Sequence, residues 1–166
     1  MTTLTAERLR ELLQYDPSSG LFTYRVQRGK QRAGNIATTI DRHGYITISI
    51  DYRRHFAHRL AFLFMHDEWP KGDIDHINGI KGDNRFHNLR VVNNRTNLEN
   101  QRKAPRHNLS TGILGVSRSG GSKKNPYRAS IMINGRFVHL GNFPTSDAAR
   151  TAYLHAKRQH HGGCTI

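Results

Sequence analysis

A polar segment near the middle of the chain limits what the rest can fold into. Residues 101–110 contain Pro105 and three basic side chains, Arg102, Lys103 and Arg106. Such a stretch is typical of a linker, so we expect one at 105–111, between a module at 1–104 and a second at 112–166. With 36% hydrophobic residues in 166, each module has room for only a modest core.

The chain is strongly basic. Its 26 Lys and Arg outnumber 12 Asp and Glu, which gives a formal net charge of +14. A field of this sign concentrates an extended polyanion at the surface, so nucleic acid is the expected partner. Charge alone also fits a protein that is merely soluble or that binds polyanions without specificity, so the motifs have to decide.

Two sequence features indicate in which cellular compartment the protein acts. Cys164 is the single cysteine, which excludes an internal disulfide and a zinc site built from cysteines. No apolar run approaches the ~18 residues that span a bilayer, and the N-terminal leucines are mixed with charged residues. We therefore expect a soluble, unprocessed protein in the cytoplasm, that of the host cell if a phage encodes it, with no membrane partner.

The periodicity of both modules predicts an α+β fold. In the first module it predicts helices at 6–14 and 57–66 and strands at 21–25, 45–50 and near 52–56. The basic glycine loop 28–34 is either a solvated turn or a phosphate contact. In the second module we expect strands at 113–118, 127–133 and 136–140, then a helix that Thr145 caps and that reaches about His160. The second module is thus a small three-stranded antiparallel sheet packed on one helix.

The chemistry is concentrated in a series of short polar motifs. They are, in chain order, His58-Arg59-Leu60, Asp75-His76-Ile77-Asn78-Gly79, Asn84, His87-Asn88-Leu89 and Asn97-Leu98-Glu99-Asn100. This pattern resembles the HNH, or ββα-metal, nucleases, particularly the homing-type members of phages and introns. The resemblance implies two antiparallel strands, at 74–77 and 88–92, and a helix at 94–102 that together hold one divalent ion.

The resemblance also implies roles that suit the residue types. Asp75 and Asn97 would be the metal ligands, and their hard oxygens suit Mg²⁺, with Mn²⁺ as the alternative. His76 would be the general base, because a neutral imidazole can take a proton from water near neutral pH. Asn88 would orient the ring of His76 through its amide oxygen. Many family members carry a histidine where Asn97 stands, and the amide oxygen should favour Mg²⁺ over softer ions.

Other residues of the motifs have a less definite reading. His58 precedes a leucine-rich helix at the place where homing-type relatives show His-Arg-Leu, and a structural role is as open as a direct one, so we assign it a supporting position behind the site. Asn78, Asn84 and Asn94 are read as turn or cap residues, because asparagine tolerates left-handed turns.

The second module carries its own resemblance. Gly115-Val116-Ser117-Arg118, Tyr127-Arg128-Ala129-Ser130-Ile131, the run from Gly135 to Phe143, and Ala152-Tyr153 are similar to the Apetala-type DNA-binding domain over about 112–162. Tyr127 stands where the plant domains usually carry tryptophan. The resemblance implies that the sheet enters the major groove, with Arg118, Arg128 and Arg136 as candidate DNA contacts. The alternative is an exposed basic sheet with no sequence preference.

These features predict a metal-dependent endonuclease that hydrolyses phosphodiester bonds in double-stranded DNA, with a preferred site and no obligate small-molecule ligand. One metal centre cuts one strand, so a monomer should nick, and a double-strand break needs a second protomer or a second visit; monomer and dimer both stay open. The main alternative is a non-catalytic DNA-binding regulator that retains the nuclease scaffold. An RNA-binding or general basic structural protein is a weaker one.

Overall fold

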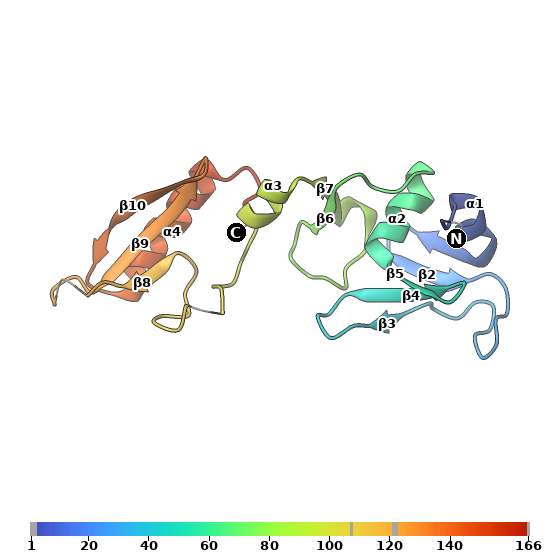
Figure 1. The fold of residues 1–166 in the computed structure, drawn as a ribbon. Coiled ribbons are helices and arrows are strands. Elements are labelled where there is room, and N and C mark those ends of the chain that lie inside the picture. Colours follow the sequence, from blue (N-terminus) through green and yellow to red (C-terminus); the bar gives the residue numbers. More distant parts are fainter. Residues whose placement is uncertain (1–2, 107, 121–122, 166) are drawn as a thin grey trace. The chain divides into compact units, whose positions relative to one another are not determined.

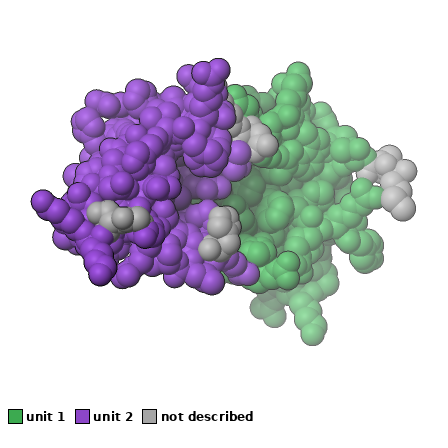
Figure 2. Space-filling view, turned by 60° about the vertical axis from the view of Figure 1, so that its left-hand side comes forward, with its two compact units in different colours: residues 1–93 green, residues 94–166 purple. Residues whose placement is uncertain are grey.

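The computed structural model describes residues 3–106, 108–120 and 123–165, and the chain divides into two compact units (Figure 2). The first unit ends at Asn93 and the second begins at Asn94. The architecture is α+β with small antiparallel sheets, as the periodicity predicts. The division falls before the helix at 94–99, whereas the sequence places the linker after it. Within the described residues, no helix combines the length and apolarity that a membrane span requires.

Over residues 3–93 the first unit contains three small sheets and two α-helices; Figure 1 shows their arrangement. Its sheets are β1–β2, β3–β4–β5 and β6–β7. The helices are α1 (Ala6–Leu12) and α2 (Ala57–His66), and the 3-10 helix η1 is Phe86–Asn88. The strands are β1 (Leu13–Asp16), β2 (Leu21–Tyr24), β3 (Thr39–Ile40), β4 (Ile46–Ile50), β5 (Arg53–Phe56), β6 (Asp73–His76) and β7 (Leu89–Val92).

A hydrophobic core supports this unit. It is built from the buried faces of α1 and α2 and from alternate residues of the strands, including Leu9, Leu60 and Ile48. The helix predicted at 6–14 ends at Leu12, and the next residues form β1, which the periodicity missed. Leu13 and Tyr15 alternate inward over only four residues, a signal too short to separate from the preceding helical pattern.

The β6–β7 pair carries the candidate catalytic motif. Its register places Asp75 opposite Arg90 and His76 opposite Leu89. The loop 77–88 joins the two strands, and η1 occupies its end. Each strand is shifted by about one residue from its predicted bounds, so Asn88 lies in η1, immediately before β7.

The second unit is a three-stranded sheet covered on one face by a long helix (Figure 1). The sheet order is β10–β9–β8. Small inward residues such as Val116, Ala129 and Ala149 let α4 lie close to the sheet, and Thr145 caps α4 by accepting from the Ala148 N–H at 3.2 Å, as predicted. The elements are α3 (Asn94–Glu99), β8 (Val116–Arg118), β9 (Tyr127–Ile133), β10 (Arg136–Phe143) and α4 (Ser146–His160).

The end of the chain folds back onto the segment that follows α3. The Thr165 hydroxyl donates to Asn100 Oδ1 at 2.7 Å, and the Gly163 N–H donates to Glu99 Oε2 at 3.5 Å. The buried ammonium of Lys157 donates to the carbonyl of Gln101, and burial lowers the pKa of Lys157. Helix α3 is therefore held by the C-terminal residues of its own unit.

Candidate active site

His76 lies at the end of β6 with only 4% of its surface exposed. Its Nε2 pairs with Oδ1 of Asn84 at 3.3 Å. Burial lowers the pKa of His76, while the bond to Asn84 and the charge of Asp75 act in the opposite direction. The imidazole is therefore neutral near pH 7, the state that a general base needs.

His58 contacts this ring directly. It is the second residue of α2, and its ring meets His76 edge to face with 5.2 Å between centroids. The rings of Phe56 and Tyr45 enclose it at 5.3 and 5.4 Å. Its buried Nδ1 has no hydrogen-bond partner among the described residues, and burial lowers the pKa of His58 to about 3. His58 is thus a neutral ring packed behind His76, and its supporting role stays a prediction.

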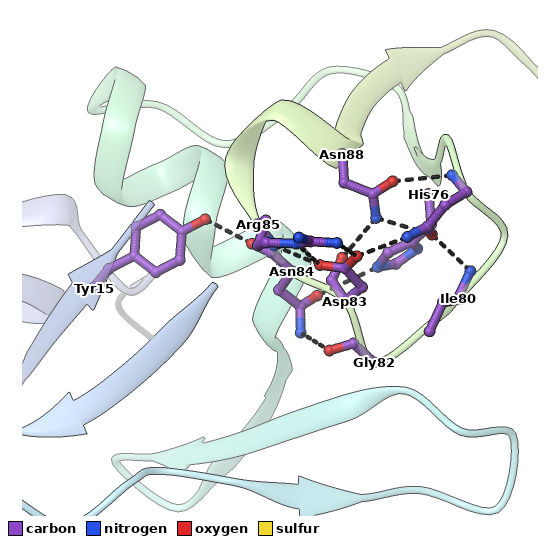
Figure 3. Close-up of polar contacts among 9 residues, drawn as sticks. Tyr15, His76, Ile80, Gly82, Asp83, Asn84, Arg85 and Asn88 are labelled. Atoms are coloured by element: carbon purple, nitrogen blue, oxygen red, sulfur yellow. Dashed lines mark hydrogen bonds and ion pairs between the residues drawn. The ribbon is translucent and has the colours of Figure 1, made fainter. Parts of the chain in front are cut away.

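Among the described residues, the side chain of Asn88 makes its hydrogen bonds to Asn78 and Asp83 and none to His76, which differs from the prediction. It is 5% exposed, and its amide closes the loop 77–88: Oδ1 accepts from the Asn78 N–H at 2.9 Å, and Nδ2 donates to the Asp83 carbonyl at 2.8 Å (Figure 3). The physical reason is its place in η1, one residue before strand pairing begins, from which the side chain extends into the loop. Asn88 therefore stabilises the closed conformation of the loop 77–88.

Asn84, read from sequence as a turn residue, is the side chain that pairs with His76 through a hydrogen bond. It is 3% exposed, and its amide lies between the ring of His76 and the carbonyl of Gly82. Its position eight residues after a candidate base is the only signal that the sequence offers. Asn78 keeps its predicted turn role, since its Oδ1 accepts from the Ile80 N–H at 2.8 Å. The side chain of Asn94 lies outside the described part of the chain.

The carboxylate of Asp75 is held by an arginine that the sequence reading missed. Arg90 donates to Oδ2 of Asp75 from Nε at 3.0 Å and from the terminal guanidinium nitrogen at 2.8 Å. The two residues are directly opposite in the β6–β7 register, so the alternation of the strands puts them on one face. That register could have identified Arg90, had it been known from the sequence.

The residues proposed to hold the ion fit a hard cation by their donor chemistry. Asp75 supplies a largely buried carboxylate, and Asn97 lies exposed on α3. No three His, Cys, Asp or Glu side chains of the described residues form a metal-binding group, and a site of one carboxylate and one amide oxygen needs none. The pairing of Asp75 with Asn97 on one ion involves both units and stays a prediction.

The three candidate DNA-contacting arginines do not share one face of the sheet. Arg128 points away from α4, in line with Ser117 and Asn142 of the neighbouring strands. Arg118 is paired with Tyr127, and its guanidinium lies 5.6 Å from the centre of that half-buried ring. Arg136 is opposite Ile133, which packs against the core, so it also belongs to the helix side.

The outward face of the sheet carries more than Arg128. Phe137 is 79% exposed and lies opposite Met132, while His139 lies opposite Ser130. A shallow hollow on this face is lined by Arg128, Ser130, Phe137 and His139. The face therefore offers a cation, an aromatic ring and hydrogen-bonding groups together, whereas Arg118 and Arg136 flank the sheet at its ends.

Comparison with known proteins bears on this arrangement. Residues 55–99 match the family model described as HNH endonuclease. Among solved structures, the chain is similar to the one titled "DNA binding and cleavage by the HNH homing endonuclease I-HmuI", with 22% identity, coverage of 92% of this chain and 88% of that chain, and a TM-score of 0.43. No curated protein matches the chain. The Apetala-type resemblance of 112–162 stays a prediction. The segment that runs from β5 to α3, and that holds every residue of the candidate active site, is similar to HNH endonucleases.

Proposed function

We propose that the chain is a metal-dependent DNA endonuclease of the HNH type that hydrolyses phosphodiester bonds in duplex DNA. The observation that carries the proposal is the buried, neutral His76 beside Asp75, in the segment that matches the HNH endonuclease family model. The formal charge of +14 supports a polyanionic substrate.

In the proposed reaction His76 takes a proton from a water molecule. The water oxygen attacks phosphorus opposite the 3′ oxygen, the bond between phosphorus and that oxygen breaks, and the departing oxygen takes a proton from solvent. A divalent ion held by Asp75 and Asn97, Mg²⁺ or Mn²⁺, would supply positive charge for the phosphate and leaving oxygens. Asn88 keeps the loop 77–88 closed, and His58 packs against the base.

The second unit would add a separate DNA footprint. An Apetala-type sheet in the major groove would use the outward face around Arg128, with Phe137 and His139 beside it. Arg118 and Arg136 would then reach phosphates at the ends of the sheet.

A single active centre implies nicking by a monomer and a double-strand break by two protomers or two visits. We further propose that the enzyme cuts DNA at a preferred site. This activity would suit a homing-type endonuclease that a phage encodes and that acts inside the host cell.

One observation favours a second candidate, a DNA-binding regulator without catalysis. The Asp75 carboxylate is paired with Arg90, whose charge repels a cation at the same carboxylate. The two candidates agree on DNA binding and differ on cleavage.

Incubation of supercoiled plasmid with the full chain, in Mg²⁺ or in EDTA, separates them on native and denaturing gels. The proposed nuclease should cut with Mg²⁺ or Mn²⁺, stop in EDTA, and still bind DNA there. The His76→Ala protein, purified in the same way, controls for a contaminating nuclease. Binding without cleavage would establish the regulator, and cleavage that survives EDTA would refute the metal site.

A further inference from the structure

We propose that Asn84 is a positioning residue that fixes His76 in the tautomer with hydrogen on Nε2, so that Nδ1 takes the proton from water, and that the N-terminal hairpin holds Asn84 in place. The inference rests on the proposed function, in which His76 is the base. The N-terminal hairpin is β1, β2 and their turn, residues 13–24, far from the motif in sequence.

The orientation of the Asn84 amide follows from its two neighbours. One end of the amide lies 3.3 Å from the carbonyl oxygen of Gly82, which can only accept a hydrogen bond, so that end is the donor Nδ2. The other end is Oδ1, which can only accept, and it lies 3.3 Å from Nε2 of His76. Nε2 must therefore be the nitrogen that carries hydrogen in the neutral ring.

The consequence for the chemistry is that Nδ1 keeps its lone pair. Among the described residues, no hydrogen bond to Nδ1 of His76 is present, so this atom is available to a water molecule. Loss of the Asn84 acceptor would let the ring exchange between its two tautomers, and in one of them Nδ1 could no longer accept a proton.

Two hydrogen bonds connect the N-terminal hairpin to the backbone at and near Asn84. The Tyr15 hydroxyl donates to the Asn84 carbonyl at 2.7 Å (Figure 3). The Phe86 N–H donates to the Pro17 carbonyl at 2.9 Å. Tyr15 is fully buried and stacked on Phe22 at 4.6 Å, and burial raises the pKa of its hydroxyl, which therefore stays a donor. Figure 3 shows Tyr15 on one side of Asn84 and His76 on the other.

Gly20, in the turn of the hairpin, shows how closely the two segments approach. Its φ is +76°, and a Cβ at this position would collide with the backbone of Asn84 and Arg85. A backbone that passes so near a loop restricts the loop to one conformation. The N-terminal hairpin is thus a support for the amide that faces the base.

The test is a long-range ¹H–¹⁵N correlation spectrum of the His76 ring in the ¹⁵N-labelled full chain without DNA. We expect a protonated Nε2 and an unprotonated Nδ1 in the wild type, averaging of the two nitrogens in Asn84→Ala, and retention of the wild-type tautomer in Asn84→Asp, which keeps an acceptor. Tyr15→Phe should shift the ring signals toward the average, and Tyr24→Phe, on the same hairpin, should not. Hydrogen on Nδ1 in the wild type would overturn the proposal.

Single-turnover cleavage supplies the second readout. Asn84→Ala should slow cleavage by about 10- to 100-fold at saturating DNA while DNA affinity is retained, and Asn84→Asp should recover part of the rate. An unchanged tautomer and an unchanged rate in a folded Asn84→Ala protein would contradict the positioning role. If the wild type cuts no DNA, the proposed function fails, and the spectrum still decides which nitrogen carries hydrogen.

Discussion

The candidate residues of the two units differ in how they are held. In the first unit His76, Asn84 and Asn88 are nearly inaccessible and linked by hydrogen bonds to a closed loop. In the second, Arg118, Arg128 and Arg136 are exposed and lie on different faces of a sheet. Buried polar groups need hydrogen-bond partners, and these partners hold the side chains in one geometry, as catalysis requires. Exposed cations instead act on a polyanion through their charge. Substitutions in the first unit should therefore alter rate, and those in the second should alter affinity.

The largest expected effect is on the base. His76→Ala should lower the single-turnover cleavage rate by about 10² to 10⁴ while DNA binding persists, because the phosphate contacts lie elsewhere. His87→Ala is the matched control, since His87 is exposed and close in sequence. An essential His87 with a dispensable His76 would show that the motif is assigned in the wrong register.

A pair of glycines tests the packing of the second unit. Gly115 and Gly135 both have left-handed φ values, +74° and +78°, but a Cβ would overlap the Tyr153 ring at Gly115 and meets open space at Gly135. Both alanine variants incur a backbone cost of about 1–2 kcal/mol, and overpacking at Gly115 adds about 1–3 kcal/mol. Thermal and urea unfolding measure the difference. Equal losses would mean that α4 can move away from the sheet without cost.

The third prediction concerns acid stability of the first unit. Burial lowers the pKa of His58 from its ordinary value of 6.5 to about 3 in the folded chain. Between these two values, the unfolded chain binds a proton at His58 that the folded chain does not. Stability is therefore complete above pH 6.5 and falls as the pH drops toward 3, by about 2 kcal/mol at pH 5. His58→Phe should remove this part of the slope in urea unfolding at pH 5 and 7. An unchanged slope would show that His58 does not stay neutral.

The smallest effects should be those of single arginines in the second unit. Arg128→Ala should weaken duplex binding by about 1 kcal/mol and, if it contacts a phosphate, lower the log-log salt slope by about 0.9. Arg118→Ala and Arg136→Ala should have less effect, because neither lies on the outward face. Binding isotherms at several salt concentrations test the order. Equal losses for all three would favour a diffuse basic surface over a recognition face.

Much of the fold follows from local patterns. The bounds of α2, β9 and α4 agree with the periodicity because each is long enough to show several repeats of its pattern. The short strands β1 and β3 were missed, since β1 directly continues the helical pattern of α1 and β3 has only two residues. The motif containing Asp75 and His76 is local as well, and the match of 55–99 to the HNH endonuclease family agrees with it.

Sequence alone determined the basic charge, the α+β class and the residue types of the candidate site, because each of these depends on composition or on neighbours in the chain. Only the tertiary structure decided which side chains contact the residues of the candidate site. The contact of Asn84 with His76 depends on the path of a loop, the pairing of Arg90 with Asp75 depends on strand register, and Tyr15 contacts Asn84 across 69 positions. Such partners are set by packing in three dimensions, which leaves no local signal at either residue.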